Sequence, residues 1–226
     1  MSHVIKTLLN GLIDYAGLFP PAQESMESAA AKYASYLGGP WAFALGRFIV
    51  PVARLGELAQ NASKLTIEKP WRLSALAGAD LDRDLHLVEA FNDEHAGRFV
   101  IDGLEIKPEK PASIESALEL IPPEVTAYYE LPLLPEPSPF LAALRGSAGR
   151  AKIRMGGVLE SAFPTAHVVA AFLKLAAASS VSFKATAGLH HPLHGRYPLT
   201  CEPGATQGPM HGFLNLVITA ALVREG

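Results

Sequence analysis

The chain has 226 residues, of which 49% are apolar and 18% are charged, a composition typical of a soluble globular protein with a large core. Its 19 basic and 22 acidic residues give a net charge of −3 and form no basic block, which argues against a nucleic-acid partner. Cys201 is the only cysteine, which excludes an intrachain disulfide and a CxxC metal site. We expect no signal peptide and no membrane-spanning segment, and therefore a cytoplasmic protein.

Apolar, β-branched or aromatic runs alternate with stretches of helical period, the pattern of repeated βα units with a parallel sheet. Eight strands are predicted, at residues 12–18, 42–50, 72–77, 103–107, 127–131, 151–155, 182–187 and 211–216. Helices are predicted at residues 25–37, 55–65, 80–95, 113–121, 138–145, 165–179 and 217–224. This order predicts an α/β fold, a (β/α)8 TIM-type barrel that forms a single domain over residues 1–226.

A doubly wound open sheet is the alternative architecture. The chain lacks the Gly-rich nucleotide fingerprint of that fold, and its polar residues occur in many strands instead of at one switch point, so the barrel is favoured. Residues 190–210, after the seventh predicted strand, have no helical period and many Gly and Pro residues. A structureless loop of this length is typical of a lid or binding loop.

Four of the predicted strands each carry two polar side chains two residues apart. Residues i and i+2 of a strand share a face, and strands of a parallel sheet are otherwise apolar. A recurrent polar pair therefore marks a candidate site. The pairs are Glu105 and Lys107, Tyr128 and Glu130, Lys152 and Arg154, and Lys184 and Thr186.

Lys184 lies in the middle of the seventh predicted strand. A lysine desolvated inside a barrel has a lowered pKa and becomes a nucleophile for carbonyl carbons, the basis of Schiff-base chemistry. The competing interpretation is a buried ion pair with Glu105 or Glu130.

Lys152 and Arg154 are followed by Gly156 and Gly157. Arginine suits bidentate binding of a carboxylate or phosphate, and glycines let a ligand approach backbone N–H groups. With Gly188 on the next loop, these residues predict an anion site near the usual phosphate site of such barrels. A tight Gly-Gly turn is the alternative.

Glu105 and Glu130 are the candidate general acid/base groups, and charge balance for the nearby cations is their alternative role. Asp14 and Arg47, in the first two predicted strands, are further polar candidates.

Four histidines fall close together, at His190, His191, His194 and His211. Their density could hold a divalent metal, although no HxH, HExxH or CxxC spacing is present. The preferred interpretation gives one or two of them an acid/base or hydrogen-bonding role at the mouth of the barrel, together with Asn215.

The segments AKIRMGG, FKATAGLHHPL and MHGFLN, with DYAGLFPPA near the start, resemble a family of uncharacterised bacterial proteins that share these blocks in this order. The stretch Lys184-Ala185-Thr186-Ala187-Gly188 is also similar to the Schiff-base strand of lysine-dependent barrel aldolases of the deoxyribose-phosphate aldolase type. That resemblance implies a barrel enzyme with a nucleophilic lysine. In those aldolases the lysine lies on the sixth strand, and no His-His-Pro follows it.

We therefore expect a lyase or aldolase that acts on a small anionic carbonyl compound without a cofactor, and a homodimer is compatible with the apolar composition. A metal-assisted hydrolase or isomerase and a non-catalytic binding barrel are the alternatives. The candidate catalytic residues are Lys184, Glu105, Glu130 and Lys152. The candidate binding residues are Arg154, Gly156, Gly157, Lys107, Thr186, Gly188, His190, His191, His211, Asn215, Asp14 and Arg47.

Overall fold

A computed structural model describes residues 3–134 and 136–225 as an α/β protein with two compact units, residues 1–105 and 106–226. The first unit runs α1 (His3–Leu9), β1 (Ile13–Tyr15), α2 (Met26–Leu37), β2 (Leu45–Pro51), α3 (Leu55–Ala62), β3 (Trp71–Leu76), α4 (Leu81–Glu94) and β4 (Phe99–Ile106). The second runs α5 (Pro111–Leu120), β5 (Thr126–Glu130), α6 (Ser138–Leu144), β6 (Arg150–Arg154), α7 (Ala166–Ala178), β7 (Phe183–Thr186), β8 (Gly195–Pro198), β9 (Gln207–Met210) and α8 (Phe213–Glu225).

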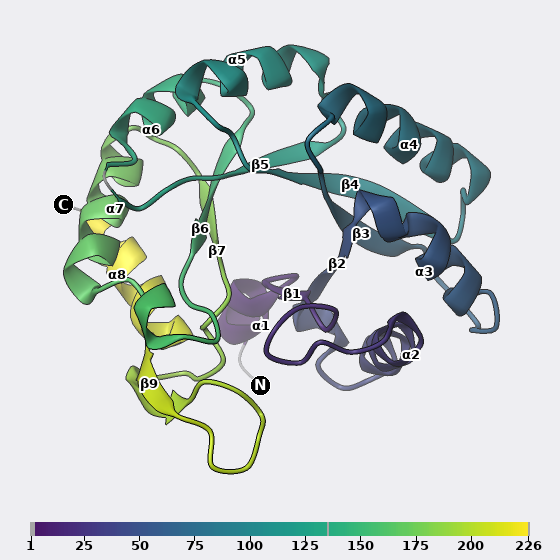
Figure 1. The fold of residues 1–226 in the computed structure, drawn as a ribbon, viewed down its shortest axis with the longest axis horizontal. Helices are drawn as coiled ribbons and strands as arrows, with labels where there is room; N and C mark the ends of the chain where they lie inside the picture. Colours follow the sequence, from purple (N-terminus) through teal and green to yellow (C-terminus); the bar gives the residue numbers. More distant parts are fainter. Residues whose placement is uncertain (1–2, 135, 226) are drawn as a thin grey trace. The chain divides into compact units, whose positions relative to one another are not determined.

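Strands β1 to β7 are parallel to their neighbours wherever a register is resolved, and in each unit they pair in chain order. Seven of the eight predicted strands are confirmed. The α/β fold with alternating strands and helices is confirmed with them. In the second unit, helices α5, α6 and α7 lie along one side of β5, β6 and β7 (Figure 1).

Local sequence accounts for where several helices begin. The side chain of Ser25 accepts the N–H of Ser28 at the start of α2, and Thr165 does the same for Val168 at the start of α7. Pro111 opens α5, where its missing N–H costs nothing. These caps explain why the predicted starts of α2 and α7 fall within one residue of the observed ones.

The core of the first unit is an aromatic cluster of buried rings. Tyr33 and Trp71 pack edge to face with centroids 5.0 Å apart, and Phe48 lies 5.3 Å from Tyr33. The hydroxyl of Tyr33 donates a hydrogen bond of 2.8 Å to the carbonyl of Gly46. Helix α2 is thereby fixed to strand β2.

The eighth predicted strand, at residues 211–216, is wrong, because helix α8 begins at Phe213 and takes up the rest of the chain that the structure describes. Loop carbonyls satisfy the first helical N–H groups. The N–H of Phe213 donates to His191 at 3.0 Å, and that of Leu214 donates to Pro192 at 3.1 Å. The apolar run that begins at Phe213 fits either a strand or a helix, and these hydrogen bonds at its start favour the helix.

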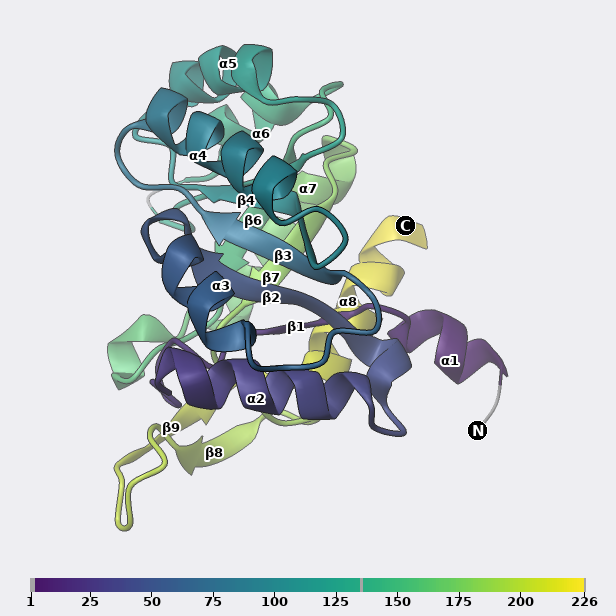
Figure 2. The same cartoon turned by 90° about the vertical axis from the view of Figure 1, so that its right-hand side faces the viewer.

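The prediction of a structureless loop over residues 190–210 is also wrong. Strands β8 and β9 form an antiparallel hairpin, and Figure 2 shows the connection between them as an extended loop. Leu199 and Met210 are buried against Phe163 in a small cluster with Tyr197. Tertiary packing thus orders a segment whose Gly and Pro content indicates a loop.

By length and composition, Glu160–Ala178 is the one helical stretch among the described residues apolar enough to cross a membrane, and 28% of it is buried. The core helix of a soluble protein meets the same description.

Two buried tyrosines differ in how their hydroxyls are paired. The hydroxyl of Tyr129 has no hydrogen-bond partner among the described residues, and burial raises the pKa of Tyr129 to about 12. We expect Tyr129→Phe to leave the free energy of unfolding unchanged or to raise it by up to about 1 kcal/mol. Tyr33→Phe is the control, because it orphans the Gly46 carbonyl, and it should cost about 1–2 kcal/mol in urea unfolding. Equal losses in both variants would contradict this account.

Candidate functional site

Three charged side chains lie at one level across the strands of the second unit. Glu130 on β5 pairs in register with Lys152 on β6, and Lys152 pairs with Lys184 on β7. Residues in register on neighbouring parallel strands point to the same side of the sheet. Glu130, Lys152 and Lys184, which we call the cross-strand rung, therefore share one face.

The rung contains a close ion pair. Lys152 Nζ lies 2.7 Å from Glu130 Oε2, and the side chain of Lys152 is only 7% exposed. A lysine this buried requires a compensating charge, which Glu130 supplies. The ion pair is what the charge-balance interpretation of Glu130 predicts.

Lys184 is half-buried and is held over an aromatic ring. Its Nζ lies 4.6 Å from the ring centroid of Tyr128, a cation–π contact. Lys152 is its neighbour in register on β6. The surroundings of Lys184 thus include an aromatic ring and a second lysine.

One level further along the strands, Arg154 pairs in register with Thr186. This level lies about 6.6 Å beyond the rung, because each residue of a strand rises about 3.3 Å. Arg154 Nε donates a 3.0 Å hydrogen bond to the carbonyl of Gly156. The bond orients the guanidinium at the carboxyl end of β6.

A cavity of about 580 Å³ opens at this end of the strands. We call it the strand-end cavity. Two exposed cations, Lys107 and Arg154, line it together with two carboxylates, Glu109 and Glu130, and with Ser161. Its other lining residues are almost all apolar, among them Leu131, Leu133, Leu134, Phe140 and Val168. Charged side chains of both signs beside an apolar wall suit a small polar molecule with an apolar part.

Gly156 and Gly188 are explained by packing. A Cβ on Gly188 would lie 2.8 Å from the Cα of Gly156, and Gly188 has a φ of +65°. Ala187 before it has a φ of +62°, a conformation that costs a non-glycine residue free energy. These contacts require no bound anion, and they fix the chain that follows β7.

The predicted polar residues of the first unit make contacts within it. Asp14 Oδ1 accepts the backbone N–H of Arg47 at 2.7 Å, and Arg47 Nε lies 2.6 Å from Asp102 Oδ1. Glu105 is 4% exposed and accepts a 3.0 Å hydrogen bond from Ser74. The Asp14 and Glu105 contacts join neighbouring strands, and the Arg47–Asp102 ion pair links β2 to β4 across β3.

The histidines lie along the hairpin segment of the second unit. His191 stacks on Tyr197 at 3.5 Å, while His194 and His211 have ring centroids 5.8 Å apart. Partial burial, with a smaller contribution from His191, lowers the pKa of His190. Among residues 3–134 and 136–225, no group of three or more His, Cys, Asp or Glu side chains is arranged to hold a metal ion.

His211 and Asn215 do not line the strand-end cavity. They line a second cavity, between α7 and α8, which contains neither Lys184 nor Arg154. Of the predicted site residues, Lys107, Glu130 and Arg154 line the strand-end cavity, whereas Lys152, Lys184 and Thr186 are not among its lining residues.

Sequence reasoning missed the apolar wall of the strand-end cavity. Its members include Leu133 and Leu134 of the loop after β5 and Phe140 of α6. Leu134 is 67% exposed. The signal was present in the segment LPLL, because an apolar run in a loop leaves some of its residues exposed, and exposed apolar patches can mark interaction sites.

Comparison with known proteins gives no match, either to a protein-family model or to a curated protein.

Proposed function

We propose that the protein is an enzyme of the lyase or aldolase type that acts on a small anionic carbonyl compound through a Schiff base on Lys184. The observation that carries the proposal is that Glu130 of the cross-strand rung and Arg154, one level further along the strands, both line the strand-end cavity. Lys184 lies in register with Lys152, the ion-pair partner of Glu130. An anion held by Arg154 and Lys107 would extend its carbonyl group toward the rung.

The proposed chemistry uses side chains alone. The free amine of Lys184 adds to the carbonyl carbon, and loss of water leaves a protonated imine. The protonated imine accepts an electron pair when the bond between its α and β carbons breaks, which gives an enamine. Glu130, at 2.7 Å from Lys152, accepts the proton of the hydroxyl on the β carbon, so that the departing fragment leaves as a carbonyl compound. Glu130 returns this proton to the α carbon, and hydrolysis of the imine restores the amine.

We also propose that the strands follow the plan of a (β/α)8 barrel. In support, strand order follows chain order within each unit, without the reversal that defines a doubly wound sheet. Residues 211–216 do not supply the eighth strand of such a barrel.

Borohydride trapping tests the Schiff base directly. The purified protein is incubated with pyruvate, acetaldehyde or glycolaldehyde phosphate, reduced with borohydride, digested and analysed by mass spectrometry. We expect a reduced adduct on Lys184 with at least one probe. Lys184→Met should abolish it, whereas Lys174→Met, which changes an exposed lysine on α7, should retain it.

Three other results have distinct meanings. An adduct on Lys152 that persists in Lys184→Met would move the nucleophile by one strand and overturn the assignment. Absence of any adduct would reject covalent chemistry with these carbonyl classes. Tight binding of a probe that is released unchanged, and is weakened by Arg154→Met, would indicate a non-catalytic binding protein.

A further inference from the structure

Residues 160–164, which we call the wall segment, contact both the strand-end cavity and the hairpin of β8 and β9. Ser161, Ala162 and Pro164 line the cavity. The other two residues, Glu160 and Phe163, contact the hairpin. A change on the hairpin side of the wall segment would therefore reach the cavity on its other side.

Two side-chain contacts of unequal strength join the hairpin to the wall segment. Phe163 is buried together with Leu199, directly after β8, and Met210 of β9. Arg196 of β8 lies 3.5 Å from Glu160, but both side chains are more than half exposed, so solvent screens this ion pair. The apolar cluster around Phe163 is therefore the stronger of the two contacts.

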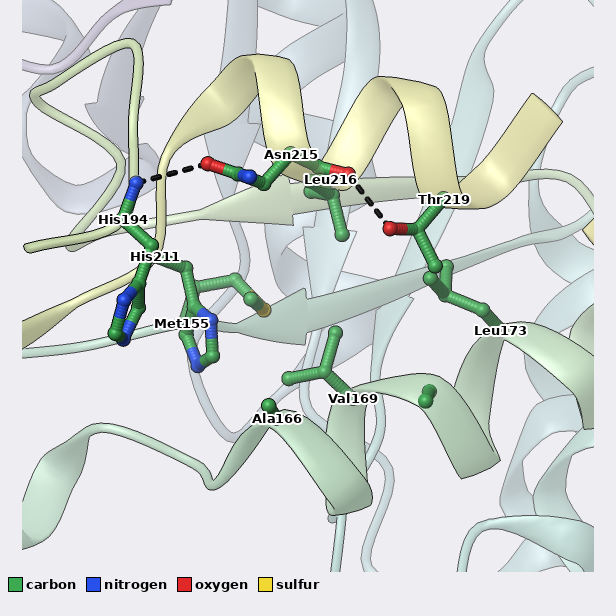
Figure 3. A pocket seen from close by; sticks show the side chains of 10 residues that line it. Met155, Ala166, Val169, Leu173, His194, His211, Asn215, Leu216 and Thr219 are labelled. Atoms are coloured by element: carbon green, nitrogen blue, oxygen red, sulfur yellow. Dashed lines mark hydrogen bonds between the residues drawn. The ribbon is translucent and has the colours of Figure 1, made fainter. Parts of the chain in front are cut away.

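His211, directly after β9, adds a hydrogen bond at the end of the wall segment. Its Nε2 lies 2.6 Å from the carbonyl oxygen of Pro164. A carbonyl only accepts, so Nε2 carries the proton and donates it. Pro164 precedes Thr165, the N-cap of α7, and its carbonyl lies outside the hydrogen bonds of that helix. Figure 3 shows the imidazole of His211 next to that of His194, at the end of the second cavity where α7 begins.

The wall segment also packs on the loops that follow β6 and β7. The ring of Phe163 occupies the space that a Cβ on Gly156 would need, and a Cβ on Gly188 would lie 2.8 Å from the same ring. The carbonyl of Gly156 accepts the 3.0 Å hydrogen bond from Arg154 Nε. A displacement of Phe163 would therefore release Gly156, and with it the group that orients the Arg154 guanidinium.

We propose that His211 is a positioning residue of the strand-end cavity. Together with the hairpin it holds the wall segment in place and, through Phe163 and Gly156, it holds Arg154. This role rests on the proposed function, because it takes Arg154 to bind the anionic part of the substrate. His211 itself contacts neither the substrate nor the reacting atoms.

Two polar substitutions isolate the hydrogen bond to Pro164. The amide nitrogen of glutamine lies as many bonds from Cβ as Nε2 of histidine does, whereas that of asparagine lies one bond closer and falls short of the carbonyl. We expect His211→Asn to speed amide hydrogen exchange at Ala162 and Phe163 about five- to tenfold, the effect of one lost hydrogen bond. Both N–H groups donate within the turn at the start of the wall segment, to Leu159 and Glu160.

His211→Gln should restore the exchange rates of the wild-type protein, because it keeps a donor for Pro164. His167→Leu is the matched control, since it removes an exposed histidine of α7, and it should leave these rates unchanged. If His211→Asn does not fold, Leu199→Ala, which loosens the cluster around Phe163, should give the same increase in exchange.

Borohydride trapping on Lys184 tests the effect on the site. Glycolaldehyde phosphate and acetaldehyde both present an aldehyde, but only the first carries an anionic group. We expect His211→Asn to raise the half-saturating concentration of glycolaldehyde phosphate about fivefold and to leave that of acetaldehyde unchanged. His211→Gln should again restore the wild-type value. A purely structural role would change both probes alike.

The possible failures of this role and of the lyase chemistry are distinguishable. Unchanged exchange at Ala162 and Phe163, an equal increase throughout α7, or equal changes for the two aldehydes would each overturn the role of His211. Absence of an adduct in the wild-type protein would reject the lyase chemistry. The exchange rates would still decide whether His211 holds the wall segment.

Discussion

Gly188→Ala should destabilise the protein by about 3 kcal/mol. A left-handed conformation costs an alanine about 1–2 kcal/mol, and Gly188 has a φ of +65°. The added Cβ would also lie 2.8 Å from the Cα of Gly156, the carbonyl oxygen of Met155 and the ring of Phe163. Overpacking of this kind costs about a further 1–3 kcal/mol, because two of the three atoms belong to the backbone and cannot move aside.

Gly204→Ala is the matched control. Gly204 has a similar φ of +76°, but nothing lies within 4 Å of the position of its Cβ. It should therefore show only the conformational cost, about 1 kcal/mol. Urea unfolding followed by circular dichroism measures both variants. Equal losses would mean that the approach of the two loops at Gly156 and Gly188 contributes no steric constraint.

Asp102→Ala should destabilise the protein by about 2–3 kcal/mol. The Asp102 carboxylate accepts hydrogen bonds from Arg47 Nε at 2.6 Å and from Arg72 Nε at 2.8 Å. Its side chain is 22% exposed and that of Arg47 is 13% exposed, so solvent screens the interaction only in part. Removal of the carboxylate leaves two guanidinium groups close together, which adds repulsion to the lost attraction.

Glu57→Ala is the control for an exposed pair. Glu57, in the first turn of α3, pairs with Arg54, the residue before the helix, at 2.7 Å, and both side chains are exposed. Loss of this ion pair should lower the free energy of unfolding by no more than about 0.5 kcal/mol. The loss of stability in Asp102→Asn should lie between the losses in Asp102→Ala and Glu57→Ala, because asparagine keeps the shape of the side chain and removes its charge. A cost for Asp102→Ala as small as that for Glu57→Ala would show that the Arg47 and Arg72 contacts are not stabilising.

The same carboxylate explains why the fourth strand was predicted too short. The predicted strand starts at residue 103, directly after the sequence FVID. The charged residue Asp102 in that sequence indicates a loop that ends before the strand. Asp102 lies inside β4 because arginines from β2 and β3 neutralise it. Compensation by partners distant in sequence cannot be read from a local pattern.

The alternation of strands and helices was predictable because each strand is short, apolar and bounded by turn residues. The two-residue spacing also indicated correctly that Lys152 and Arg154 belong to one face of β6. It could not show that Glu130, Lys152 and Lys184 lie side by side, because that depends on register between strands. His211 and Asn215 were grouped with Lys184 because residues 211–216 were predicted to form a strand, and the helix that forms there takes Asn215 to α8.

The loop between β8 and β9 offers a practical consequence for experiments. Cys201, the single thiol of the chain, is exposed in this loop. A maleimide fluorophore would therefore attach at one defined position without disturbing the buried Leu199 and Met210. Its anisotropy would report how the hairpin moves when a compound enters either cavity, so the native sequence already carries its own labelling site.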